Sequence, residues 1–244
     1  SGERRPFRLE ILMTYTVTAR CARTGQLGIG IATYSLAVGG YCPAIRGGFG
    51  AVSTQAFVNL KLGTLALRLM EQGYSPSKVM AELSDDDPDF TYRQVGIVDG
   101  DGQTAVYTGE NTRPWSGHVR GDGFITMGNV LAGEGVVTAM AEAFAANGAE
   151  DLDERLLRTL EAGRDAGGQQ AGDGTHLNER SAAVITHSHR DYAHMDLRVD
   201  AHDTAVEELR RVHSVYKPFE PYYQLRHVDP AKTPAQDVWA RDNL

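Results

Sequence analysis

Thr14 follows Met13 at the start of TYTVTAR (residues 14–20), a stretch whose alternation is typical of a β-strand. Every second residue from Thr14 to Arg20 would share one face of that strand. If a chain begins at Thr14, a free α-amine lies beside the hydroxyl, and such an amine can act as the base that activates a weak nucleophile. A β-branched threonine also simply suits a strand, so the residues leave both interpretations open.

An amide hydrolase needs a base with a pKa near neutrality and hydrogen-bond donors aimed at the developing oxyanion. A free α-amine has a reference pKa of about 7.7–8.0, so Thr14 suits this chemistry only when its amine is exposed. Arg20 is a candidate supporting charge because it shares the face of Thr14. Strand-end hydrogen bonding and ion pairing explain the same residues without catalysis. The candidate donors are Ser53, Thr54, Gln55, Asn59 and Asn129.

Two other chemistries deserve comparison. Cys42 in GGYCPAI is an alternative nucleophile, but a single cysteine is commonly a buried small hydrophobe, and no sequence neighbour obviously lowers its pKa. In THSHRDYAH, His187 and His189 share a strand face with His194 across a turn, yet no acidic or cysteine ligand has matching spacing. The glycines at 47–50 and 133–135 lack the order of a phosphate-binding loop. We therefore expect no metal and no other cofactor.

The composition narrows the class of protein. A chain of 244 residues with 41% hydrophobic residues can bury a sizeable core, most simply in one large domain. The net charge of −8 argues against a nucleic-acid surface, and no apolar run is long enough for a membrane span. Residues 1–12 lack the apolar run of a signal peptide, and two cysteines give no disulfide framework. We expect a cytoplasmic protein without nucleic-acid or membrane partners.

The elements that position these residues occur in segregated runs of strands and helices. Such runs predict an α+β fold of two packed antiparallel sheets with helices outside. In residues 27–33, Leu27 and Ile29 alternate with Gly28 and Gly30, so one face is bare enough for another layer to approach closely. Strands are expected at 14–20, 27–33 and 50–57, in hairpins over 92–109 and 117–129, and in 180–200; helices are expected at 60–72, from Ser75–Pro76, around 136–144, from Asp151–Glu154 and from Thr204–Glu207, with a flexible loop at 167–179.

The tail from residue 216 is rich in proline and aromatic residues, including Tyr222, Tyr223 and Trp239. It is too short for a core of its own, so we expect it to lie over the domain or over a neighbouring subunit. Its apolar surface predicts a homodimer or a higher homo-oligomer. The expected organisation is an N-terminal extension at 1–13, a domain at 14–215 and this tail at 216–244.

A series of motifs, in one order from Met13 to Val212, resembles the domain-of-unknown-function family 1028. They are MTYTVTARCARTGQLGIGIAT, LAVGGYCPAIRGGFGAVSTQAF, YRQVGIVDGDGQTAVYTG, GDGFITMGNVLAG, VVTAMAEAF, ERLLRTLEAGRDAGG, RSAAVI and DLRVDAHDTAVEELRR. Members of that family are similar in fold to the N-terminal nucleophile (Ntn) hydrolases. The resemblance implies a four-layer αββα sandwich, and by analogy a Thr nucleophile at the mature N-terminus.

The resemblance places Thr14 at the usual start of the family, which implies that Thr14 is the nucleophile. Two positions depart from the family pattern. Tyr34–Ser35 stands where a basic or imidazole side chain is common, and Gln169 stands where an acidic residue is frequent. The expected function is hydrolysis of an amide or other C–N bond in a small molecule by Thr14, with Arg20, Thr54, Gln55 and Asn129 in support. The alternative is a small-molecule-binding protein that keeps the fold without catalysis.

Overall fold

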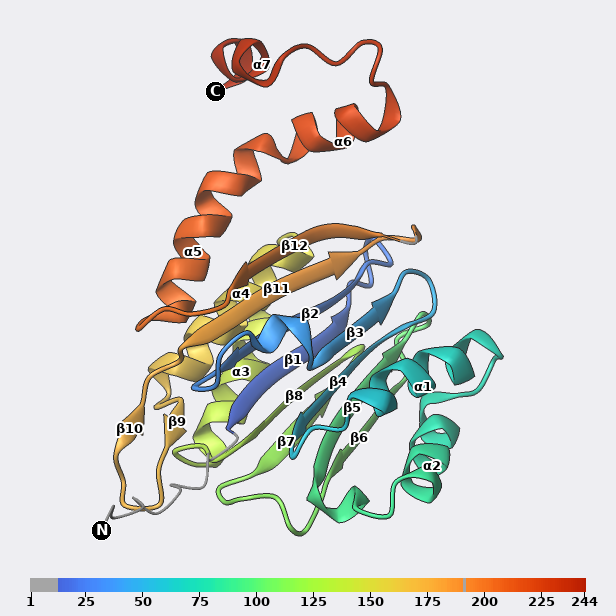
Figure 1. Ribbon diagram of the computed structural model, residues 1–244, viewed down its shortest axis with the longest axis vertical. Coiled ribbons are helices and arrows are strands. Elements are labelled where there is room, and N and C mark those ends of the chain that lie inside the picture. Colours follow the sequence, from blue (N-terminus) through green and yellow to red (C-terminus); the bar gives the residue numbers. More distant parts are fainter. Residues whose placement is uncertain (1–12, 191) are drawn as a thin grey trace, which may run out of the picture.

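The computed structural model describes residues 13–190 and 192–244, so the expected N-terminal extension, apart from Met13, lies outside the described residues. The described chain forms four layers, with helices on both outer sides of two stacked β-sheets (Figure 1). Every pairing between neighbouring described strands is antiparallel. The predicted αββα sandwich of two antiparallel sheets is confirmed.

The larger sheet has six strands, and β1 and β2 lie next to each other near its middle, as predicted. Across this sheet the order is β12 (Ala193–Val199), β11 (Ser181–His187), β2 (Leu27–Thr33), β1 (Thr14–Arg20), β8 (Phe124–Asn129) and β7 (Gly117–Gly121). The smaller sheet has the order β3 (Pro43–Arg46), β4 (Gly50–Ala56), β5 (Arg93–Asp99) and β6 (Thr104–Thr108).

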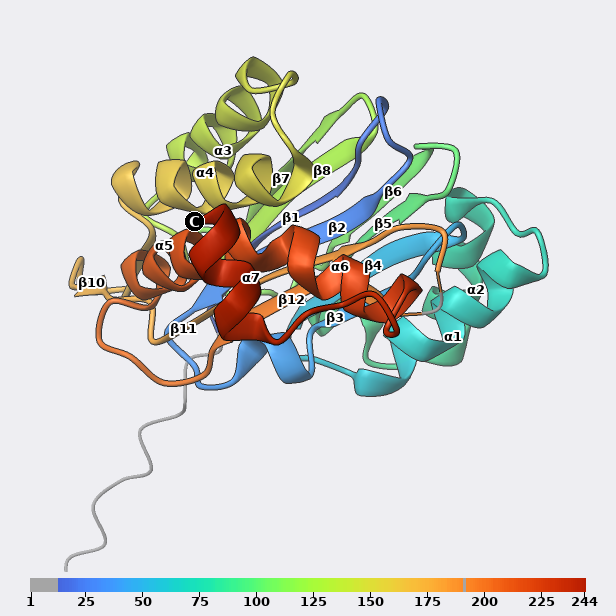
Figure 2. The same ribbon diagram turned by 90° about the horizontal axis from the view of Figure 1, so that it is seen from above.

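Helices cover the outer face of each sheet (Figure 2). The smaller sheet is covered by α1 (Leu60–Glu71) and α2 (Pro76–Asp86), and the larger one by α3 (Glu134–Ala146), α4 (Leu152–Asp165) and α5 (Ala205–Tyr216). Short 3₁₀ turns occur at Val38–Gly40, Phe90–Tyr92 and Lys217–Phe219. The expected loop at 167–179 contains two short paired strands, β9 (Gln169–Gln170) and β10 (His176–Leu177). No described helix has the length and apolar character that a membrane crossing requires.

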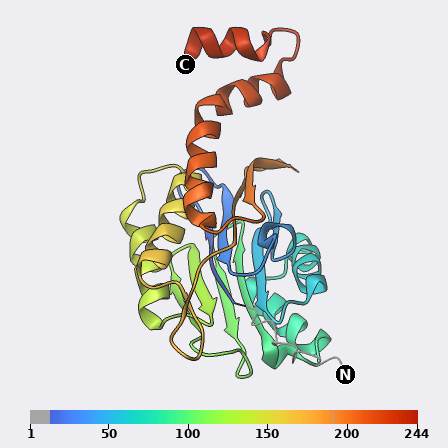
Figure 3. The same ribbon diagram turned by 60° about the vertical axis from the view of Figure 1, so that its left-hand side comes forward.

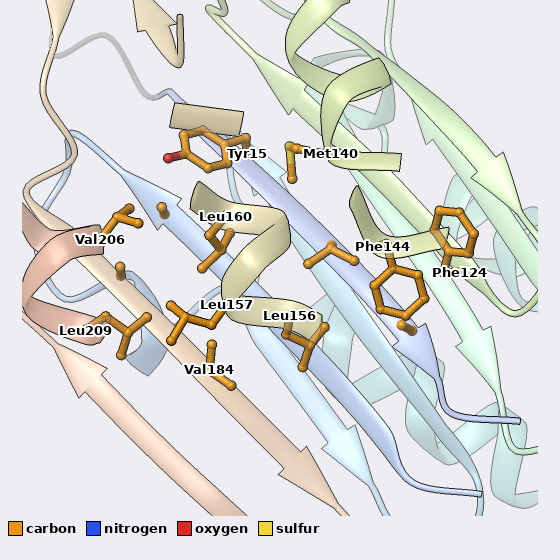
Figure 4. Packing of buried hydrophobic residues seen from close by; sticks show 14 of the residues in the cluster. Tyr15, Phe124, Met140, Phe144, Leu156, Leu157, Leu160, Val184, Val206 and Leu209 are labelled. Atoms are coloured by element: carbon orange, nitrogen blue, oxygen red, sulfur yellow. The ribbon is translucent and has the colours of Figure 1, made fainter. Parts of the chain in front are cut away.

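Alternation along β1 and β2 separates two hydrophobic layers. Tyr15 and Val17 of β1 pack against α3 and α4 in the cluster drawn in Figure 4, whereas Leu27 and Ile29 of β2 point between the two sheets. The bare face of β2 meets α4 closely, because a Cβ atom placed on Gly28 would lie only 2.7 Å from Leu156 Cδ1. The glycines therefore let a helix approach the sheet, as their pattern predicts.

Two predicted helix caps do not form, although their helices begin close to the expected residues. Asp151 precedes α4 without a capping bond, and its carboxylate instead accepts a hydrogen bond from Arg23 at 3.1 Å. Thr204 precedes α5, and its hydroxyl lies 3.3 Å from His202 Nδ1. The Asp151 side chain bonds to Arg23 instead of to the first turn of α4, and the Thr204 side chain bonds to His202 instead of to the first turn of α5.

The C-terminal arm (residues 217–244) carries α6 (Glu220–Val228) and α7 (Gln236–Asn243), which stand away from the sandwich (Figure 3). Its aromatic rings pack on one another, with the centroid of Trp239 5.5 Å from that of Tyr222 and 6.0 Å from that of Phe219. The arm touches the sandwich where Glu220 bonds to His194 and where His227 stacks on Tyr192. The proline-rich and aromatic composition of the tail does not by itself predict this local aromatic cluster.

Candidate functional site

Thr14 is the first residue of β1 and lies between two neighbouring strands of the larger sheet. Its backbone is in register with Thr33 at the end of β2 and with Asn129 at the end of β8. The side chain is only 6% exposed. Since Thr14 and Thr16 alternate with Tyr15, which packs against the outer helices, both threonines face the space between the two sheets.

The Thr14 hydroxyl begins a short hydrogen-bond chain that returns to its own peptide bond. Thr14 Oγ1 donates to Thr33 Oγ1 at 3.3 Å, and Thr33 Oγ1 in turn donates to the carbonyl oxygen of Met13. Met13 precedes Thr14 and is buried. The nitrogen of Thr14 is therefore an amide in this chain, and an amide nitrogen does not act as a base.

A group of side-chain amides holds the main chain at Thr14. Gln55 Nε2 donates to the carbonyl oxygen of Thr14 at 3.2 Å and to Gln94 Oε1 at 2.7 Å. Asn129 Nδ2 lies 3.5 Å from the same carbonyl oxygen and 3.2 Å from Gln94 Oε1. Both hydrogens of each amide nitrogen are thus engaged. In this state Gln55 and Asn129 position Thr14 and offer no spare donor to an oxyanion.

Gln94 links the two sheets and was missed by sequence reasoning. Its amide nitrogen lies within 3.1 Å of Thr108 Oγ1 and of the carbonyl oxygens of Gly117 and Gly128. The same network includes Thr16 Oγ1, which donates to Gln55 Oε1 at 2.5 Å. The one sequence feature that could have identified Gln94 is its place near the start of β5, where a polar residue occupies a position that faces the other sheet.

Backbone strain marks the two strand ends that carry these amides. Ala56 directly follows Gln55 and has a φ of 66°, while Val130 directly follows Asn129 and has a φ of 53°. A left-handed conformation is costly for a residue with a side chain, above all for a β-branched one such as Val130. Strain of this kind is held in place by its surroundings and concentrates at functional sites.

Several buried polar atoms near this edge have no hydrogen-bond partner among the described residues. They include Asn129 Oδ1, Ser53 Oγ and both side-chain amide atoms of Gln169. Gln169 pairs with Leu131, and the N–H of Gln170 donates to the carbonyl oxygen of Val130 at 3.0 Å, so β9 lies beside the residues that follow Asn129. Buried polar atoms left unpaired are costly to stability, and they give this edge spare capacity to bind a polar ligand.

Two of the predicted site residues do not contact the Thr14 side chain. Arg20 lies at the far end of β1, about 20 Å away at about 3.3 Å per residue, and its side chain lies close to Gly25 and Gly102 in two turns. Thr54 alternates with Gln55 and shares the helix-facing side of β4 with Val52, so it points away from Thr14. These two residues do not belong to the group around Thr14.

The remaining candidates occupy structural positions. Asn59 precedes α1 and accepts a hydrogen bond from the Lys61 N–H at 3.2 Å, which makes it a helix cap. Cys42 is packed between the sheets, and burial raises the pKa of its thiol far above the ordinary value. His194 contacts Glu220 and Gln224 of the arm. Across residues 13–190 and 192–244, no group of three or more His, Cys, Asp or Glu side chains is placed to hold a metal ion.

The four-layer αββα sandwich of two antiparallel sheets is an Ntn-hydrolase-like fold, and Thr14 is the first residue of one of its central strands. The chain belongs to the family of unknown function DUF1028, whose sequence profile matches residues 14–209. The predicted family resemblance is confirmed.

Solved structures give further similarities. A DUF1028-family protein from Silicibacter pomeroyi is 27% identical, with a TM-score of 0.76 over 84% of this chain and 86% of that one. HslV of Trypanosoma brucei is 11% identical, with a TM-score of 0.39 over 70% of this chain and 98% of that one. Anbu (ancestral beta-subunit) of Yersinia bercovieri is 10% identical, with a TM-score of 0.40 over 91% and 98%. No curated protein matches the chain.

Proposed function

We propose that this protein is an Ntn-type hydrolase that cleaves an amide or other C–N bond in a small molecule, with Thr14 as the nucleophile. The observation that carries the proposal is the hydroxyl chain from Thr14 through Thr33 to the carbonyl of Met13. The amides of Gln55 and Asn129 support it, because they fix the backbone of the same residue. Thr14 is thus held by both of its neighbouring strands and by the opposite sheet.

The reaction requires removal of Met13, which turns the nitrogen of Thr14 into a free α-amine. That amine takes the hydroxyl proton while Thr14 Oγ1 attacks the carbonyl carbon of the substrate. The C–N bond then breaks, the amine returns the proton to the leaving nitrogen, and an ester on Thr14 remains. Water, deprotonated by the same amine, hydrolyses the ester and restores the hydroxyl. Loss of Met13 also frees the Thr33 hydroxyl to donate to the oxyanion, a role first expected of Thr54, Gln55 and Asn129.

The test compares the full chain, a chain starting at Met13 and a chain starting at Thr14 on a panel of small amides. We expect hydrolysis only from protein whose first residue is Thr14. In that form Thr14→Ala should lower kcat at least about 10³-fold, because nucleophile and base act as one unit. Thr14→Ser should keep part of the activity.

Thr18→Ala is a matched control for Thr14→Ala. Thr18 is buried on the same face of β1, and its hydroxyl has no partner among the described residues. Its removal should leave kcat within about twofold, since it lies about 13 Å along the strand from Thr14. Hydrolysis by the full chain that survives Thr14→Ala contradicts the proposal.

A second candidate function is small-molecule binding without catalysis. The packing of Met13 favours it, because this residue is buried and its carbonyl oxygen accepts the Thr33 hydroxyl. This candidate predicts that the intact mass of protein expressed from its own gene still includes Met13. It also predicts no hydrolysis by any version of the chain.

The same proposal includes a homodimer or higher homo-oligomer in the cytoplasm. The aromatic C-terminal arm supports the assembly, since Val228 and Leu244 on it are exposed apolar side chains. The two cysteines support a reducing compartment, because Cys21 and Cys42 are both buried free thiols. Light scattering at micromolar concentration tests the assembly, and a monomeric mass with the arm intact contradicts it.

A further inference from the structure

A cavity of about 340 Å³ opens near the end of β2, the strand that pairs with β1, and its lining includes Arg180 and His202. We infer that this cavity binds a carboxylate group of the substrate, so that the substrate class is a small amide with one carboxylate, such as an N-acyl amino acid. This inference rests on the proposed function for its substrate, whereas the anion site itself can be tested by binding alone. The other lining residues are Leu36, Ala201 and Asp203.

Backbone contacts link Arg180, which lines the cavity, to the strand beside Thr14. The Arg180 N–H donates to the carbonyl oxygen of Thr33 at 2.7 Å, and the hydroxyl of Thr33 accepts from Thr14. Arg180 directly precedes β11, and the strands β11, β2 and β1 are consecutive in the larger sheet (Figure 1). At about 4.8 Å per strand, the backbone at Arg180 lies about 10 Å from Thr14. A small elongated molecule can span that distance.

Arg180 supplies a positive charge to the cavity. Its guanidinium lies 5.1 Å from the centroid of the Tyr34 ring, and it makes no ion pair within residues 13–190 and 192–244. Two other arginines of this region differ, since Arg198 pairs with Asp196 and Arg164 pairs with Asp165. A guanidinium stays charged and binds carboxylates through two parallel N–H groups. The cation–π contact with Tyr34 helps to hold the guanidinium in place.

His202 adds a second donor to the cavity. Its Nδ1 accepts a hydrogen bond from the Thr204 N–H at 3.1 Å, so the neutral ring carries its proton on Nε2. The backbone N–H of His202 donates to the backbone carbonyl oxygen of Arg180 at 2.9 Å, which holds the two residues next to each other. Asp203 lines the same cavity and repels an ion of higher charge. The balance of one cation, one neutral donor and one carboxylate therefore fits a monocarboxylate better than a phosphate.

Isothermal titration of the full chain tests the site with N-acetyl-L-alanine and its neutral analogue N-acetyl-L-alaninamide. We expect the carboxylate probe to bind at least about tenfold more tightly than the amide, because only the carboxylate gains the charged contact. Arg180→Gln should remove this preference, and Arg180→Lys should keep part of it. Arg120→Gln is the matched control, since Arg120 bonds to Thr104 on the edge strand β6 and does not line the cavity.

Three results would overturn the inference: equal binding of the two probes, a preference that survives Arg180→Gln, or tighter binding of inorganic phosphate than of N-acetyl-L-alanine. Circular dichroism of each variant verifies the fold, and Arg180→Lys serves as the decisive variant if Arg180→Gln does not fold. Titration requires no turnover. A carboxylate preference without hydrolysis in any version of the chain therefore upholds the site and removes the proposed function.

Discussion

The layer between the two sheets has an apolar half and a polar end, and both are buried. The apolar half includes Leu27, Ile29, Val98, Ile125 and Met127. The polar end includes Thr14, Thr16, Thr33, Ser53, Gln55, Gln94 and Asn129. An apolar filling of the polar end would hold two sheets together as well, because burial of apolar surface is the main force that stacks them. The polar side chains at this end therefore fit the proposed function better than a purely stabilising role.

Some polar groups of the polar end are fully hydrogen-bonded, whereas others are not. Gln94 contacts groups on both sheets, whereas Ser53 Oγ and Asn129 Oδ1 have no partner among the described residues. A network built only for stability would satisfy every member, since a half-satisfied buried network costs free energy. The spare hydroxyl lies on β4 and the spare acceptor on β8, and under the proposed function they are available to the substrate.

The largest effect on stability is expected in the apolar half. Ile29→Ala should lower the free energy of unfolding by about 3–4 kcal/mol, because it removes a fully buried side chain and leaves a cavity. Urea unfolding measures the loss. The variant should still bind N-acetyl-L-alanine with the preference of the parent chain, and loss of that preference in folded protein would contradict the separation of the two halves.

A smaller loss of stability, coupled to a loss of function, is expected in the polar end. Gln94→Leu leaves the amide nitrogens of Gln55 and Asn129 without their shared acceptor, which should cost about 2–3 kcal/mol. It should also lower kcat of the Thr14-initiated chain, since the backbone of Thr14 loses its support. The exposed Gln103 provides the control, where Gln103→Leu should stay within about 0.5 kcal/mol. Unchanged kcat in Gln94→Leu would argue against a positioning network.

A pH-dependent effect is expected on the opposite face of β1. Burial raises the pKa of Glu179, which lies near Tyr15 with His176 and Glu207 as further charged neighbours. A raised folded-state pKa means that stability is fully present below the ordinary value of about 4.3 and is lost as pH rises through the folded value. Glu179→Gln removes this loss, so it should raise Tm more at pH 8 than at pH 4.5. Calorimetry at both pH values measures the difference, and an equal shift at both would contradict the assignment.

The smallest effect is expected at Thr54, which sharpens the contrast between the two faces of β4. Thr54→Val keeps the shape of a residue on the helix-facing side, so kcat should stay within about twofold. Gln55→Leu, one position along, should lower kcat at least about tenfold, because it removes a donor to the Thr14 carbonyl. Steady-state kinetics of the two variants give the comparison. Equal losses would show that strand alternation does not decide which residues serve the site.

Local pattern predicted the fold, while the site depended on contacts that pattern does not contain. Alternation gave the strands at 14–20 and 27–33 to the residue, and the glycines of β2 predicted the close approach of a helix. Arg20 lies outside the group around Thr14, because a shared face says nothing of distance along a strand. Thr54 points away from Thr14, because neighbours on a strand point to opposite sides.

The missed residues have the same physical explanation. Thr33 and Gln94 reach the site by strand pairing and by stacking of the two sheets, which join residues far apart in sequence. Nothing in the residues near Thr14 identifies such partners. The expected caps at Asp151 and Thr204 were likewise displaced by Arg23 and His202, which the local helix pattern does not include.

Acylation of Thr14 is the most direct test of the account. A chain that starts at Thr14 is treated with a β-lactone, whose strained ring opens when a nucleophilic hydroxyl attacks its carbonyl, and the modified peptide is located by mass spectrometry. We predict one acyl group on the Thr14 hydroxyl and none on the chain that starts at Met13, because only the first form has its free amine on Thr14, beside the hydroxyl. Modification of another residue, or equal modification of both chains, would contradict Thr14 as the reactive group.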